Sequence, residues 1–185
     1  MALHVIGIAG SLRAGSYNRA LLAAAVALAP PSMFIEVADL RPIPFFDGDV
    51  EAAGLPPAVA ELKTRVRNAG ALLIATPEYN YSVPGVLKNT IDWLSRGPDS
   101  ALAGKPAAVM GASPGGFGTV RSQLALRQVA QGCNLLLLQR PELHVAKAAD
   151  KFDAGGQLVD EGVRKNLVSL LSALDGWARL VGVSA

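Results

Sequence analysis

Short apolar runs alternate along the chain with longer segments in which apolar residues recur at helical spacing. Continuous apolar runs of strand length are typical of a parallel sheet that is covered on both faces. The runs predict strands over residues 3–9, 33–38, 71–76, 106–112 and 135–138. The segments between them predict helices over residues 18–28, 57–68, 86–95, 120–131 and 161–180.

This alternation predicts an α/β fold, a doubly wound five-stranded parallel sheet of order 2-1-3-4-5 inside a three-layer αβα arrangement. The length of 185 residues and the hydrophobic content of 51% suit one domain, predicted over residues 1–185. Ligands of such a sheet bind outside the carboxyl ends of the strands, where the strand order reverses. The loops after strands 1, 3 and 4 are therefore the expected functional loops.

Charge and cysteine content narrow the class of protein. Seventeen basic and 15 acidic residues give a net charge of +2, which favours neither nucleic acid nor a membrane surface as partner. No run approaches the roughly 20 apolar residues of a membrane span. The lone Cys133 fits a reducing compartment, and a cytoplasmic protein is expected. The two histidines, His4 and His144, are isolated, so no metal site is expected.

The loop after the first strand, G-S-L-R-A-G-S-Y-N over residues 10–18, combines glycines with polar side chains. Ser11, Ser16 and Asn18 supply hydroxyl and amide groups, Arg13 supplies a planar cation, and the next helix directs its N-terminal amides at the loop. These features predict a phosphate site. The alternative is ordinary helix capping by Ser16 or Asn18. Rossmann and Walker glycine patterns are absent, so a terminal phosphomonoester such as that of FMN fits better.

The loop after the third strand, T-P-E-Y-N-Y-S-V-P-G over residues 76–85, is stiffened by two prolines. Its backbone amides and aromatic surface suit a flat ring, whereas the alternative is a turn or subunit interface with buried tyrosines. The loop after the fourth strand, A-S-P-G-G-F-G-T over residues 112–119, can turn several N–H groups toward one acceptor. The alternative here is a flexible glycine-rich turn.

These three motifs, together with the helix segment V-L-K-N-T-I-D-W-L-S, resemble the NADPH-dependent FMN reductase family. The chain is most similar to the family's bacterial quinone and chromate reductases, over about residues 5–143. The resemblance implies a flavodoxin-like fold, non-covalent FMN, NAD(P)H as co-substrate and a homodimer or homotetramer. It also implies hydride transfer from NAD(P)H to flavin N5, followed by reduction of quinones, chromate, azo compounds or free flavin.

The resemblance assigns cofactor-binding roles to individual residues. The FMN phosphate would contact Ser11, Arg13, Ser16 and Asn18. The isoalloxazine ring would be bordered by Pro77, Glu78, Tyr79 and Asn80. Its ribityl and pyrimidine side would face Ser113, Gly115 and Gly116. Because the flavin supplies the chemistry, no catalytic side chain is expected.

Three further features bear on partners. Some quinone and chromate reductases carry an Arg–Tyr–Glu contact between subunits; Arg121 and Glu142 match two of its members, and Leu124 occupies the tyrosine position. Residues 42–47 are expected to line the acceptor side of the flavin, in the same or a neighbouring subunit. The alternative function is a flavodoxin-type FMN electron carrier without pyridine-nucleotide activity. Such carriers are usually strongly acidic, unlike this slightly basic chain.

Overall fold

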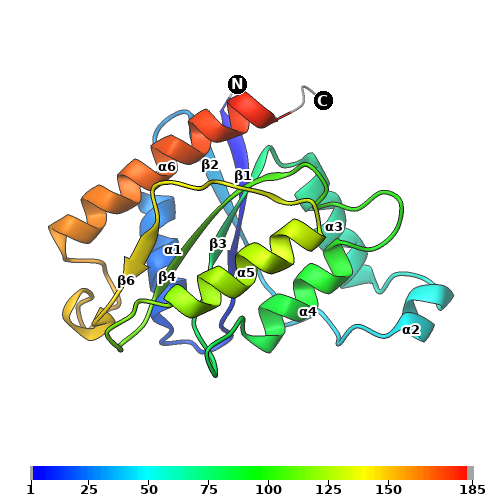
Figure 1. The fold of residues 1–185 in the computed structure, drawn as a ribbon, viewed down its shortest axis with the longest axis horizontal. Helices are drawn as coiled ribbons and strands as arrows, with labels where there is room; N and C mark the ends of the chain where they lie inside the picture. Colours follow the sequence, from blue (N-terminus) through cyan, green and yellow to red (C-terminus); the bar gives the residue numbers. More distant parts are fainter. Residues whose placement is uncertain (1, 183–185) are drawn as a thin grey trace.

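A parallel β-sheet forms the centre of the protein, and helices cover both of its faces (Figure 1). The computed structural model describes residues 2–182, so Met1 and residues 183–185 of the predicted domain lie outside the described part. The strand order β2-β1-β3-β4-β5 confirms the predicted order, and β6 also pairs with β4. The strands are β1 (Leu3–Ala9), β2 (Met33–Ala38), β3 (Ala71–Ala75), β4 (Pro106–Ala112), β5 (Leu136–Leu137) and β6 (Leu143–Val145).

The helices divide into two layers. One layer contains α1 (Tyr17–Ala27) and α6 (Glu161–Val181). The other contains α3 (Pro57–Asn68), α4 (Gly85–Leu94) and α5 (Val120–Gly132). Two short helices, α2 (Gly48–Ala53) and the 3-10 helix η1 (Ala148–Asp150), lie in connecting segments. The bounds of the five long helices agree with the predicted ranges to within one residue at each end.

Side-chain alternation along the strands builds a core on each face of the sheet. Val5 and Leu73 point into the core shared with α1 and α6, whereas their neighbours Ile6 and Leu72 point into the core shared with α3, α4 and α5. Leu167 of α6 belongs to the first core, so the last helix packs into the same core as α1. Among residues 2–182, no helix combines the length and the hydropathy needed to cross a bilayer.

Two elements differ from the predictions. The fifth sheet position, predicted as one strand over residues 135–138, is divided between β5 and β6. The intervening residues 138–142 include charged side chains and a proline, which cannot donate a hydrogen bond to a ladder. The segment over residues 40–49, predicted as a loop, runs into α2 from Gly48 onward. Helix α2 has no buried residue and hence no apolar periodicity to reveal it.

Close backbone packing draws the functional loops together at the carboxyl edge of the sheet. Loop 1 (residues 10–16) follows β1, loop 3 (residues 76–84) follows β3 and loop 4 (residues 113–119) follows β4. Gly10 begins loop 1, where a Cβ would lie 3.1 Å from both Pro77 and Pro84 and 3.2 Å from Leu87. Only glycine allows loop 1 to lie this close to loop 3 without displacing it.

Candidate functional site

Loops 1, 3 and 4 enclose a narrow cleft with a volume of about 120 Å³. It is lined by most of the residues predicted to bind a cofactor: Ser11, Arg13, Ser16, Asn18, Pro77, Glu78, Tyr79 and Ser113. The other three, Asn80, Gly115 and Gly116, are not among the lining residues and lie further along loops 3 and 4. Tyr17, Ala112 and Pro114 also line the cleft, although their side chains offer no chemical signal by which they could have been selected.

Loop 1 has unused hydrogen-bond donors. Within residues 2–182, the backbone N–H groups of residues 11–15 donate no hydrogen bond to the protein. The Arg13 side chain likewise makes no hydrogen bond or ion pair in this part of the chain, and its guanidinium lies near Gly15, where a Cβ would come within 3.2 Å of Nη1. Unpaired amides beside a guanidinium and a helix N-terminus form a suitable environment for a phosphate.

Ser16 and Asn18 have structural partners of their own. Ser16 is the N-cap of α1, and its Oγ accepts a 3.2 Å hydrogen bond from the backbone N–H of Asn18. The Asn18 side chain is 2% exposed and forms a pair of hydrogen bonds with Ala112 at the end of β4. Its Nδ2 donates to Ala112 O at 2.8 Å, and its Oδ1 accepts from Ala112 N at 2.9 Å. Asn18 therefore fastens the start of α1 to the end of β4.

Glu78 connects loop 3 to the helix that follows loop 4. Its Oε2 accepts hydrogen bonds from the backbone N–H groups of Arg121, at 2.9 Å, and Ser122, at 3.2 Å. Its Oε1 accepts from Arg121 Nη1 at 3.0 Å, and the carboxylate side chain is only 15% exposed. A negative charge at a helix N-terminus is favourable. Glu78 thus fixes the spacing between the two loops predicted to flank the ring.

The tip of loop 3 presents aromatic rings to solvent. Asn80 and Tyr81 have φ angles of 49° and 67°, and the backbone N–H groups of Tyr79 and Ser82 each donate to the other residue's carbonyl. Two successive positive φ angles of this kind define a tight turn, which holds Tyr81 at 70% exposure. Arg121 lies 4.0 Å from the Tyr81 ring centroid and 4.4 Å from that of Phe117, so loops 3 and 4 share a cation–π stack.

Backbone hydrogen bonds connect loop 4 to the end of β6 and the segment that follows it. Ser113 N donates to Val145 O at 2.9 Å, and Lys147 N donates to Gly115 O at 2.9 Å. Gly115 N donates to Ser113 Oγ at 3.1 Å, whereas Gly116 N has no acceptor within the described chain. The loop is therefore a fixed turn with part of its backbone available to a ligand.

The segment over residues 42–47 is fastened to α4 and ends in an exposed ring. Asn89 Nδ2 and Trp93 Nε1 both donate to Pro44 O, at 2.8 Å and 2.9 Å. Phe46 packs edge-on against Trp93 with ring centroids 4.9 Å apart, and its neighbour Phe45 is 85% exposed. The expected role of this segment beside the flavin stays a prediction.

The residues that match an intersubunit contact have other partners within the chain. Arg121 pairs with Glu78, as described above, whereas Glu142 pairs with Arg140 at 3.2 Å and with Arg127 at 3.7 Å. Leu124 is 57% exposed on α5. Across the part of the chain that is described, no group of three His, Cys, Asp or Glu side chains is placed to hold a metal ion.

Comparison with known proteins gives this geometry its context. The model of the NADPH-dependent FMN reductase family matches residues 3–150, which include all three loops. The chain belongs to that family. It is 50% identical over 177 residues to an NAD(P)H-dependent FMN reductase from Pseudomonas aeruginosa, covering 96% of each chain. It is 38% identical over 184 residues to a quinone reductase from Escherichia coli, covering 98% of each.

A solved structure supports the fold as well. The flavoenzyme NAD(P)H:(acceptor) oxidoreductase from Paracoccus denitrificans superposes with a TM-score of 0.90 at 32% identity, covering 98% of this chain and 100% of that one. The predicted doubly wound, flavodoxin-like fold is confirmed. The cleft fits the phosphate end of FMN because unpaired amides and Arg13 meet there. A volume of 120 Å³ is too small for the whole cofactor, so the ring would extend along loops 3 and 4.

Proposed function

We propose that the protein is an FMN-dependent NAD(P)H oxidoreductase that reduces quinones. The observation that carries this proposal is the convergence of loops 1, 3 and 4 on one cleft, with the unpaired amides of residues 11–15 beside Arg13. The matched family and the relatives named as FMN and quinone reductases support the same reaction. They give no support to the alternative of a flavodoxin-type electron carrier.

FMN supplies the redox chemistry, accepting hydride from NAD(P)H and passing reducing equivalents to the acceptor. In this proposal the protein binds and orients the cofactor. Arg13 and the loop 1 amides hold the phosphate dianion, and Asn18 and Glu78 keep the surrounding loops at fixed separation. Ser113, Gly115 and Gly116 border the other side of the cofactor, and loop 3 supports the ring through Pro77, Tyr79 and Asn80. No side chain needs to donate or remove a proton at the reacting carbon of the nucleotide.

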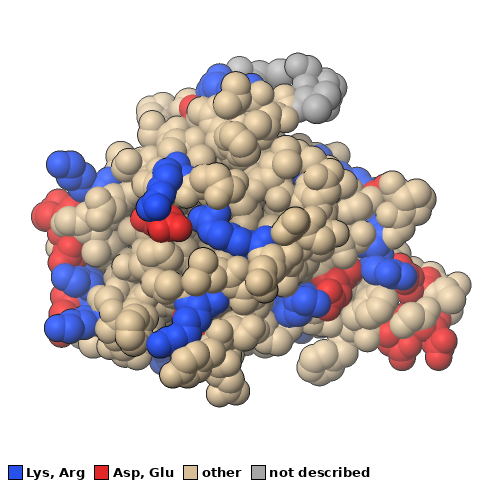
Figure 2. Space-filling model, viewed as in Figure 1, with Lys and Arg blue, Asp and Glu red and all other residues tan. Residues whose placement is uncertain are grey.

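Small molecules are the proposed acceptors. On the face drawn in Figure 2, basic and acidic groups are interspersed and form no continuous basic surface. The names of the relatives favour quinones; chromate, azo compounds and free flavin stay predictions. A steady-state panel that combines NADH and NADPH with each acceptor class would rank them.

We further propose a cytoplasmic homodimer or homotetramer in which the whole chain forms one domain. Exposed aromatic and aliphatic side chains support self-association, since Phe45, Tyr81, Phe117 and Leu124 are each more than half exposed. The packing of α6 into the core beside α1 supports the single domain. Size-exclusion chromatography with light scattering would test the oligomeric state.

Anaerobic reduction tests the redox proposal directly. The purified yellow holoprotein is mixed with one equivalent of NADPH or NADH in the absence of oxygen, and the flavin absorbance is followed. We expect the oxidised flavin band to bleach, and to return after one equivalent of a benzoquinone is added. A flavin that stays oxidised with both nucleotides would instead indicate an electron carrier.

A further inference from the structure

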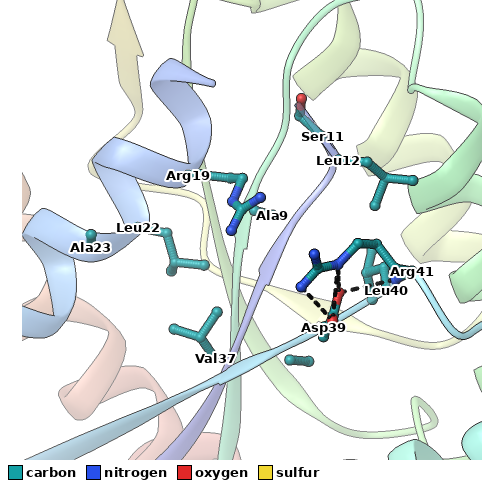
Figure 3. Close-up of a pocket in the computed structure, with 11 residues that line it drawn as sticks. Ala9, Ser11, Leu12, Arg19, Leu22, Ala23, Val37, Asp39, Leu40 and Arg41 are labelled. Carbon is teal, nitrogen blue, oxygen red and sulfur yellow. Dashed lines mark hydrogen bonds and ion pairs between the residues drawn. The ribbon is translucent and has the colours of Figure 1, made fainter. Parts of the chain in front are cut away.

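A second hollow, about 260 Å³ in volume, adjoins the cofactor cleft (Figure 3). It lies between the first turns of α1 and the residues that follow β2, at the same carboxyl edge of the sheet. Ser11 lines both the hollow and the cleft, so loop 1 is their common wall. A ligand long enough to cross loop 1 from the hollow can reach a cofactor held in the cleft.

Apolar side chains line the hollow from two sides. Leu22, Ala23 and Val37 lie together, and Leu12 lies across from them beside Arg41 (Figure 3). Leu12 and Val37 are 47% and 50% exposed, a high fraction for aliphatic side chains beside a concave surface. Such a lining suits a flat apolar group such as a nucleobase.

Two arginines and one aspartate are the charged groups that line the hollow. Arg41 is held by Asp39, with Nε 2.9 Å from Oδ1 and Nη2 2.8 Å from Oδ2. Arg19 extends from α1 toward this pair and makes no hydrogen bond or ion pair within residues 2–182 (Figure 3). The three groups carry a net charge of +1, because Asp39 balances only one arginine.

We propose that this hollow binds the adenosine end of NADPH, with Arg19 and Arg41 contacting the 2′-phosphate. This inference rests on the proposed NAD(P)H oxidoreductase function and assigns a nucleotide preference to it. A phosphate monoester is the one group that NADPH has and NADH lacks, and a guanidinium matches it in charge and geometry. In the different setting of the Rossmann fold, an arginine near the acidic ribose-binding residue accommodates the same phosphate.

The geometry allows one end of the dinucleotide to lie in the hollow while the other end reaches the flavin, which itself occupies the cleft. The nicotinamide must reach the flavin over loops 3 and 4, while the adenosine lies at the opposite end of an extended molecule. A volume of 260 Å³ is at the lower limit for a complete ligand site and suits one nucleoside end. The Asp39 carboxylate, held in place by Arg41, can accept a hydrogen bond from a ribose hydroxyl.

Arg19→Ala tests the proposal with the holoenzyme. Arg140→Ala is the matched control: it removes the same charge from an 82% exposed side chain beside the opposite edge of the sheet. We expect Arg19→Ala to raise the KM for NADPH about tenfold with kcat unchanged, and to leave the KM for NADH within about twofold. Arg19→Lys should recover part of the loss, and Arg140→Ala should change neither KM.

Calorimetry with nucleotide fragments separates binding from hydride transfer. We expect 2′,5′-ADP to bind the wild-type holoenzyme more tightly than 5′-AMP, and Arg19→Ala to remove that difference. Equal binding of the two fragments by wild type, or equal losses for NADPH and NADH in the variant, would overturn this inference. If neither nucleotide reduces the flavin, the proposed function fails instead, and the fragment titration still tests the hollow.

Discussion

Replacing Glu78 with glutamine should loosen the connection between loop 3 and α5 without changing side-chain size. The carboxylate accepts three hydrogen bonds, two from the backbone at the start of α5 and one from Arg121. A glutamine can offer its single carbonyl oxygen to the two backbone N–H groups. Its NH₂ group then faces the Arg121 guanidinium, which is also a donor, so the charged hydrogen bond is lost.

The size of the effect follows from that lost bond. A hydrogen bond to a charged group contributes about 1.5–3 kcal/mol to stability, and the 34% exposure of the Arg121 side chain places this one toward the low end. We therefore expect Glu78→Gln to destabilise the apoprotein by about 1–2 kcal/mol. For a domain of this length, that corresponds to a fall in Tm of roughly 2–8 °C. FMN affinity should also fall, because the loops predicted to flank the ring lose their fixed spacing.

A matched control separates this contact from a general charge effect. Glu61→Gln makes the same change on α3. The Glu61 side chain is 72% exposed, and its Oε1 is paired loosely with Arg65 Nη1, at 3.7 Å. Exposed pairs of this type contribute up to about 0.5 kcal/mol, so its Tm should stay within about 2 °C of wild type. Differential scanning calorimetry of both apoproteins measures the difference. Equal Tm values for the two variants would refute the proposed connection.

Three further predictions concern the cleft and the ion pairs between the sheet and α3. Arg13→Ala should weaken FMN binding by about tenfold to a hundredfold in a fluorescence titration and leave the apoprotein Tm unchanged, because the side chain is exposed. Asn18→Ala should destabilise the apoprotein by about 2–4 kcal/mol in urea unfolding, because two buried backbone groups lose their partner; a loss below about 0.5 kcal/mol would contradict this. Burial raises the pKa of Glu36, but hydrogen bonds and charges from His4 and Arg65 outweigh it and hold that pKa below its ordinary 4.5. Its stabilising contribution is therefore present above about pH 4.5 and lost as the pH falls further, so Glu36→Gln should flatten the Tm profile in that acid range.

The hydrophobic pattern was sufficient to predict the layers of the fold and the position of the site. Buried parallel strands such as residues 106–112 are apolar along their full length, which makes both the strand and its carboxyl end recognisable. The predicted strand order places the carboxyl ends of all these parallel strands at one edge of the sheet. The polar loops that follow the strands are therefore expected to meet at that edge. The segments that the pattern missed are short: β6 has three residues, and α2 has no buried side chain.

The roles of individual site residues depend on contacts that local sequence does not encode. Asn18 and Ala112 are 94 positions apart, and Glu78 and Arg121 are 43 apart. Asn18 was predicted as a phosphate ligand from its loop, yet its amide forms two hydrogen bonds with the backbone of β4. No feature of residues 10–18 alone distinguishes those two roles. Phosphate binding by Asn18 stays a prediction, to be tested beside its structural contact.

These contacts also determine how the site responds to its cofactor. Asn18 joins the start of α1 to β4, Glu78 joins loop 3 to α5, and a 3.3 Å hydrogen bond joins Ser11 of loop 1 to Tyr79 of loop 3. Because each joint uses protein groups alone, the loops are connected before any ligand binds, which lowers the conformational cost of binding. FMN should then raise the Tm only by the amount that mass action predicts from its affinity and concentration. A larger rise would mean that the loops become ordered when FMN binds.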